Sequence, residues 1–127
     1  MIVELLVGVD RRAAAIAAEM RRARFLHTLD LAYVEVVSTL RRRVARRQLR
    51  NERAMQALRG LAKAPIRRHS AAAHLERIWE LRHTHSDYDA AYLALAEALS
   101  IPLLTTNRRL ARSNGHTARI VAVGGSS

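Results

Sequence analysis

The clearest pattern of apolar and polar positions lies between Ser86 and Leu99. Apolar residues recur there at spacings of three and four, which is the pattern of one face of a helix that packs on a core. Ser86 is a good N-cap, and Asp89 three residues later completes a capping box. Asp87 and Asp89 both fall in the first turn, where the helix dipole favours negative charge. The pattern therefore predicts a well-capped helix with a buried face.

The segment after this helix has the pattern of a short buried strand. Pro102 prevents the helix from continuing, and residues 103–105 are too apolar to be solvated on both faces. A helix that leads directly into a buried strand indicates a crossover unit in a parallel sheet.

The rest of the chain alternates between the two kinds of element. Helices are predicted over residues 10–24, 31–48, 51–63, 71–82 and 108–112, and strands over residues 25–28, 66–69 and 119–123. We expect Asp30 to cap the second of these helices, with Val34 and Val37 facing inward. Residues 1–7 fit either a strand or the end of a helix. These elements predict one α/β domain over residues 1–123, followed by a frayed tail at 124–127.

Composition narrows the class of protein. Half of the 127 residues are hydrophobic, which argues against disorder. The absence of cysteine removes disulfides, zinc–thiolate sites and thiol nucleophiles, and it suits a reducing cytoplasm. No apolar run approaches the ~18 residues needed to cross a bilayer, and the first residues make a poor signal peptide. We therefore expect a cytoplasmic protein without a membrane partner.

The charge balance indicates a polyanionic partner. The chain has 22 Lys and Arg residues against 11 Asp and Glu, a net charge of +11, and Lys63 is the only lysine. Such a surplus favours nucleic acid or an acidic protein. The arginines between residues 41 and 50 form a basic stripe, which is either a solvated helix face or a contact surface for RNA phosphates or an acidic protein segment.

Two acidic residues are candidates for chemistry. Glu35 lies in the most apolar turn of its predicted helix, with Thr39 rather than a cation four residues later. A carboxylate in such surroundings is costly unless a cation meets it, although Glu35 could also be solvated or paired through the tertiary fold. Asp89 is explained locally as a helix cap. That role is compatible with metal binding, because sites gather at the C-terminal edge of parallel sheets.

Two runs near the C-terminus resemble PIN-domain proteins, and most of all the VapC toxins of bacterial VapBC toxin–antitoxin pairs. The runs are Tyr-Asp-Ala-Ala-Tyr-Leu-Ala-Leu-Ala-Glu at residues 88–97 and Pro-Leu-Leu-Thr-Thr-Asn-Arg-Arg-Leu-Ala at residues 102–111. The rhythm of helices and strands fits the same family from about residue 3 to residue 123. The resemblance implies a helix-rich, three-layer α/β/α sandwich with a parallel sheet.

The resemblance also implies an activity and a site. VapC-like proteins are metal-dependent endoribonucleases, expected here to use Mg²⁺ or Mn²⁺ and to cleave RNA. The resemblance implies that Glu35 and Asp89 are catalytic residues and metal ligands, and that Asn107 is a third metal ligand. Thr105, Arg108 and Arg109 would contact the substrate. The implied partners are a cognate VapB-like antitoxin and a second copy of the chain in a homodimer.

The sequence departs from the family pattern in two places. Asn107 stands where many relatives have Asp, so it brings an amide oxygen but no charge. Family members also open with a strand that ends in Asp, and then a helix similar to residues 3–6. The segment that carries this Asp is missing here, so the resemblance implies a ribonuclease impaired by its loss and by Asn107. We therefore expect Glu4 to belong to that helix, and the central strand to be absent or rebuilt from residues 1–7.

These departures leave two alternatives to an active ribonuclease. The chain could be a catalytically inactive PIN-like protein that binds RNA or an antitoxin through its basic surface. It could also be a basic helical nucleic-acid-binding protein outside the family. The second alternative fails if the last strands are parallel and the two carboxylates converge.

Overall fold

The computed structural model describes residues 4–7, 25–105 and 108–122. In this part of the chain, the strands form one five-stranded sheet in the order β3-β2-β1-β4-β5, and every pairing is parallel. The strands are β1 (Glu4–Val7), β2 (Phe25–Leu29), β3 (Ile66–His69), β4 (Leu103–Thr105) and β5 (Ile120–Ala122). The predicted parallel sheet is therefore confirmed.

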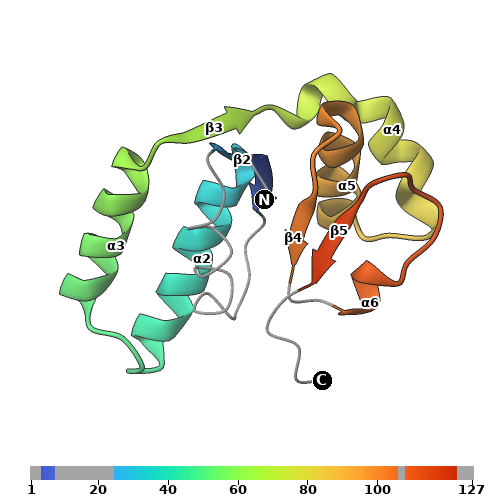
Figure 1. Cartoon of the computed structure of the whole chain (residues 1–127). Coiled ribbons are helices and arrows are strands. Elements are labelled where there is room, and N and C mark those ends of the chain that lie inside the picture. The colour runs from blue at the N-terminus through green and yellow to red at the C-terminus, as the bar shows by residue number, and fades with distance from the viewer. Residues whose placement is uncertain (1–3, 8–24, 106–107, 123–127) are drawn as a thin grey trace.

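Helices cover both sides of this sheet. The helical elements are α2 (Leu31–Ala45), α3 (Asn51–Lys63), η1 (Ala71–His74), α4 (Leu75–Glu80), η2 (Leu81–His83), α5 (Asp87–Leu99) and α6 (Arg108–Ala111). Figure 1 shows α2 and α3 on one side of the strands and α4 and α5 on the other. This arrangement is the three-layer α/β/α architecture expected from the sequence.

Helix α5 is the centre of the core. Every residue from 90 to 95 is buried, and Leu93 and Leu95 have no exposed surface. The many alanines let the helix backbone approach its neighbours closely. The helix ends where Ser100 adopts a left-handed conformation with φ 54°, and the Ile101 amide bonds to the Ala96 carbonyl. Pro102 then directs the chain into β4, as predicted.

The N-terminal segment differs from the expectation set by the family resemblance. Residues 4–7 form β1, the central strand, whereas the resemblance placed Glu4 on a helix. The alternative of a strand rebuilt from residues 1–7 is the one observed. In the register, Leu6 pairs with His27 on one side and Leu103 on the other. This segment can occupy the centre because its short apolar run offers backbone hydrogen-bonding groups to two neighbours.

Several predicted boundaries also need correction. Helix α2 ends at Ala45 rather than Gln48, and its cap residue Asp30 makes no side-chain capping bond. Val34 and Val37, predicted to face inward, are 71% and 47% exposed. The predicted helix over residues 71–82 is divided, because tight 3₁₀ turns flank the short α4. The helix predicted over residues 10–24 and the tail at 124–127 lie outside the described residues.

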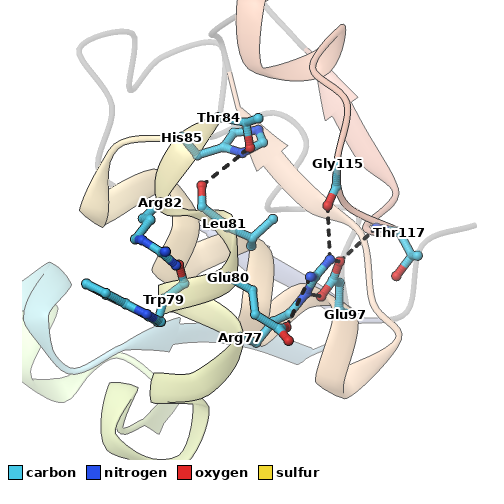
Figure 2. Close-up of polar contacts among 10 residues, drawn as sticks. All are labelled: Arg77, Trp79, Glu80, Leu81, Arg82, Thr84, His85, Glu97, Gly115 and Thr117. Carbon is cyan, nitrogen blue, oxygen red and sulfur yellow. Dashed lines mark hydrogen bonds and ion pairs between the residues drawn. The ribbon is translucent and has the colours of Figure 1, made fainter.

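A cluster of ionic contacts ties α4 to α5 and to the segment before β5 (Figure 2). The Arg77 guanidinium donates to Glu97 Oε1 at 2.7 Å and Oε2 at 2.9 Å, and it also donates to the Gly115 carbonyl at 3.0 Å. The Thr117 amide donates to Glu97 Oε2 at 2.7 Å. The hydrogen bond from Arg77 lowers the pKa of Glu97 to about 2. This cluster holds together segments that are distant in the sequence.

Candidate active site

The candidate site lies where the parallel strands end and the helices on either side begin. Strand β2 leads into α2, which carries Glu35, while α5 begins at the same edge and carries Asp89 in its first turn. In a parallel sheet with crossover helices, helix N-termini gather at the C-terminal ends of the strands. The topology therefore brings the start of α2 and the start of α5 to one edge.

Asp89 is held in place by the cap of α5. The Ser86 hydroxyl oxygen accepts a hydrogen bond from the Asp89 backbone amide at 3.3 Å, which confirms the predicted cap. The Asp89 side chain is half-buried. Because the cap bond uses the Asp89 backbone, it leaves the role of the carboxylate open.

Glu35 is bound by a residue of α5. The Tyr92 hydroxyl donates a hydrogen bond to Glu35 Oε1 at 3.0 Å, across 57 residues of chain. Tyr92 lies three residues after Asp89 on the same helix, so the two side chains project from the same side of α5. The apolar surroundings of Glu35 in the sequence are thus explained by a tertiary partner, and that partner lies one turn from Asp89.

Two residues near the candidate carboxylates have shifted pKa values: Tyr92, which contacts Glu35, and His85, which lies near Asp89. Burial, and then the negative charge of Glu35, raise the pKa of Tyr92 well above its usual value, so its hydroxyl remains a donor. Burial and the neighbouring His116 ring lower the pKa of His85, while the charge of Asp89 acts in the opposite direction. Asp89 therefore lies within electrostatic range of His85.

The other predicted site residues have different placements. Thr105 is the last residue of β4 and is 8% exposed, so it lies at the expected edge but below the surface. Arg109 is exposed on α6. Arg108 begins α6, and its side chain and Asn107 lie outside the described part of the chain. The roles assigned to these four residues stay predictions.

The donor set is suited to a hard divalent cation, but it is small. Carboxylate oxygens are the ligands that Mg²⁺ prefers, and Mg²⁺ is usually held by one or two carboxylates together with waters. Within residues 4–7, 25–105 and 108–122, no three His, Cys, Asp or Glu side chains are placed to hold one metal ion. A role for Glu35 and Asp89 as a two-carboxylate Mg²⁺ site therefore stays a prediction.

Tyr92 is the residue that the sequence pattern concealed. Its place in the helical spacing of α5 predicts a core residue, and its 6% exposure agrees. The available signal was its hydroxyl, because a buried tyrosine usually needs a hydrogen-bond partner. The pattern could not identify that partner, since Glu35 lies on another helix.

Comparison with known proteins places this architecture in a family. The family model described as PIN domain matches residues 1–115. The chain belongs to the PIN-domain family. This PIN-domain protein is 35% identical to Ribonuclease VapC12 of Mycobacterium tuberculosis over 111 residues, covering 87% of this chain and 86% of that protein. It is 39% identical over 106 residues to Ribonuclease VapC3 of Pyrobaculum aerophilum, covering 80% and 81%. It is therefore VapC-like, as the sequence motifs indicated.

A solved structure supports the same fold. The crystal structure of PAE2754 from Pyrobaculum aerophilum matches with a TM-score of 0.58, covering 87% of this chain and 84% of that one. The sequence identity is 22%, so this likeness concerns the fold alone. In the described part of this PIN-domain protein, the helices are too short or too polar to cross a membrane.

Proposed function

We propose that this PIN-domain protein is a metal-dependent endoribonuclease toxin that hydrolyses RNA phosphodiester bonds. The observation that carries the proposal is the Tyr92–Glu35 hydrogen bond, which brings Glu35 to the helix that bears Asp89. The relatives that bear the name Ribonuclease VapC support the reaction class. A cytoplasmic location follows from an RNA substrate and agrees with a chain that contains no cysteine.

In this proposal, Glu35, Asp89 and Asn107 hold Mg²⁺ or Mn²⁺ through their side-chain oxygens. A cation bound there lowers the pKa of a coordinated water and stabilises negative charge on the phosphate oxygens. The carboxylates also accept, through a water, the proton released when water attacks phosphorus. Asn107 contributes no charge, so we expect the site to hold its cation less tightly than one with a third carboxylate.

The substrate is proposed to bind through phosphate contacts. Thr105 ends β4, and Arg108 and Arg109 begin α6. We propose that these three residues hold the phosphates beside the scissile bond. A second positive surface, the arginine hairpin, lies where α2 joins α3. It consists of exposed arginines at positions 41, 42, 43, 46, 47, 50 and 53. Such a cluster favours RNA backbone binding that weakens as salt rises.

Cleavage of a labelled single-stranded RNA by the purified chain tests the proposal. We expect cleavage in Mg²⁺ or Mn²⁺, its loss in EDTA, and its recovery when excess metal is returned, because the carboxylates act through the cation. A mock purification from cells without the gene is the control for contaminating nuclease. Cleavage that is equally fast in EDTA would refute metal dependence.

The second candidate function is an inactive PIN-like protein that binds RNA or an antitoxin through its basic surface. The exposed arginine hairpin favours it, and so does the finding that no three His, Cys, Asp or Glu side chains among the described residues are placed to hold a metal ion. The same RNA distinguishes the two functions. Salt-sensitive binding without turnover in any metal supports the second candidate, and metal-dependent turnover eliminates it.

We also propose a homodimer and a VapB-like antitoxin as partners. Large apolar side chains are exposed on both sides of the sheet: Val34 (71%) on α2, and Leu75 (62%) and Trp79 (66%) on α4. Large apolar side chains exposed in this way are candidates for burial in a protein interface. Light scattering of the purified chain should therefore give twice the monomer mass of 14.3 kDa. A concentration-independent monomer would contradict the homodimer.

A further inference from the structure

The Tyr92 hydroxyl joins three elements at the candidate site. Its side chain projects from α5, donates to Glu35 on α2 at 3.0 Å and also interacts with the Thr28 hydroxyl on β2. Tyr92 is 6% exposed, and Thr28 is also 6% exposed. The hydroxyl therefore sits at a junction between α5, α2 and the C-terminal half of β2, with little access to water.

Packing alone does not explain a tyrosine at this position. Phenylalanine would fill almost the same space in the core, whereas a buried hydroxyl costs free energy unless it is hydrogen-bonded. Here the hydroxyl is bonded to Glu35, one of the two carboxylates that the family resemblance selects. The bond is charge-assisted, which makes it stronger than a bond between neutral groups.

Glu35 needs such a partner to be held in one orientation. A glutamate side chain has three rotatable bonds and loses considerable entropy when it is fixed. Tyr92 and Asp89 lie on the same side of α5, so a bond from Tyr92 holds the Glu35 carboxylate beside the turn that carries Asp89. In metal sites, hydrogen bonds of this kind orient the ligating carboxylates.

We propose that Tyr92 is a positioning residue, which orients the Glu35 carboxylate so that Glu35 and Asp89 can hold one divalent cation. This inference rests on the proposed metal-dependent function. It adds that the geometry of the metal site depends on a residue that does not itself bind the cation. Loss of such a partner typically weakens metal affinity or activity by about 10–100-fold.

Tyr33 offers a matched control on the neighbouring helix. It lies two residues before Glu35, and its buried hydroxyl has no hydrogen-bond partner among the residues that the structure describes. Tyr33→Phe therefore removes a buried hydroxyl without removing a bond to Glu35. Tyr92→Phe makes the same chemical change and does remove the bond. A difference in metal affinity between the two variants therefore measures the effect of the Tyr92–Glu35 hydrogen bond, and not that of losing a buried hydroxyl oxygen.

The experiment measures Mn²⁺ binding directly, from the electron paramagnetic resonance signal of the free ion. It uses the wild-type chain, Tyr92→Phe, Tyr33→Phe, Glu35→Gln and the Tyr92→Phe/Glu35→Gln double variant. We expect Tyr92→Phe to weaken binding by about 10–100-fold, and Tyr33→Phe to bind as the wild type does. The double variant should bind no more weakly than Glu35→Gln alone, because the two residues act through one contact.

The outcomes separate this inference from the proposed function. If Glu35→Gln weakens Mn²⁺ binding while Tyr92→Phe stays within twofold of the wild type, the positioning role is wrong and the metal site stands. If Glu35→Gln binds Mn²⁺ as the wild type does, or the wild type binds none, the metal site and the positioning role both fail. Binding is compared well below the midpoint of thermal unfolding of each variant, so a loss of stability does not count as a loss of affinity.

Discussion

Asp89→Asn and Glu35→Gln should each reduce RNA cleavage by at least about 100-fold. Each change keeps the size of the side chain and one oxygen, but removes the negative charge that would bind the cation. The α5 cap should survive in Asp89→Asn, because Ser86 bonds to the backbone amide of residue 89 and not to its side chain. Initial rates on a labelled RNA at saturating Mg²⁺ measure the effect.

Asp87→Asn is the matched control for this prediction. Asp87 lies in the same first turn of α5 and is exposed, and its expected role is to interact with the helix dipole. Its replacement should leave the rate within about threefold of the wild type, since a dipole interaction contributes only ~0.3–1 kcal/mol to the helix. A cleavage rate in Asp89→Asn as high as that in Asp87→Asn would contradict a catalytic role for Asp89. Circular dichroism of each variant verifies the fold.

The local parts of this fold could be predicted from the sequence, because their causes are local. The N-cap at Ser86 and the stop at Pro102 each depend on residues within a few positions, and both are present. The one buried face predicted for α5 is wrong, because residues 90–96 are all buried, while Tyr88 of the predicted apolar face is 58% exposed. Strands β2, β3 and β4 also lie where the local sequence predicts strands. A parallel sheet then followed from the alternation of helices and strands.

The predictions that were wrong concern features that depend on contacts between segments distant in the sequence. Residues 4–7 could form a helix or a strand in isolation, and their place between β2 and β4 decides for the strand. The inward orientation predicted for Val34 and Val37 assumed a stripe at helical spacing, whereas α2 turns these side chains outward. Only the tertiary structure shows which face of α2 meets the sheet.

The same distinction applies to the candidate site. The apolar neighbours of Glu35 in the sequence indicate a carboxylate that needs a partner, and a partner from the tertiary fold is one of the alternatives. Tyr92 is that partner, and it lies 57 positions away in the sequence. The choice between a paired carboxylate and a metal ligand is not exclusive, because a carboxylate can accept a hydrogen bond on one oxygen while it binds a cation.

Glu97→Gln should destabilise the fold more than Glu80→Gln, the change at the other carboxylate that Arg77 contacts. The variant removes the charge that Arg77 contacts through two nitrogens, while Glu97 is only 12% exposed. We expect the free energy of unfolding to fall by about 2 kcal/mol, the contribution typical of hydrogen bonds to charged groups. For a domain of this size, that loss corresponds to a midpoint of thermal unfolding lower by roughly 8 °C.

Glu80→Gln is the control, because it removes the other carboxylate that Arg77 contacts. Glu80 is 64% exposed and lies 3.3 Å from the guanidinium, so solvent screens this pair. Its loss should change the free energy of unfolding by less than about 1 kcal/mol. Equal destabilisation by the two variants would show that the more buried Arg77–Glu97 contact contributes no more to stability than the exposed Arg77–Glu80 contact.

The pH dependence of Glu97→Gln provides a separate test of the same contact. The pKa of Glu97 is about 2 in the folded protein, below the ordinary value of 4.5, so folding favours its ionised form. Its contribution to stability is present above pH 4.5 and is lost as the pH falls toward 2. The difference in unfolding free energy between the wild type and Glu97→Gln should therefore be constant near neutral pH and shrink below pH 4.5. A difference that persists at pH 2 would mean that the glutamine disturbs packing, rather than removing an ionic contact that joins α4, α5 and the segment before β5.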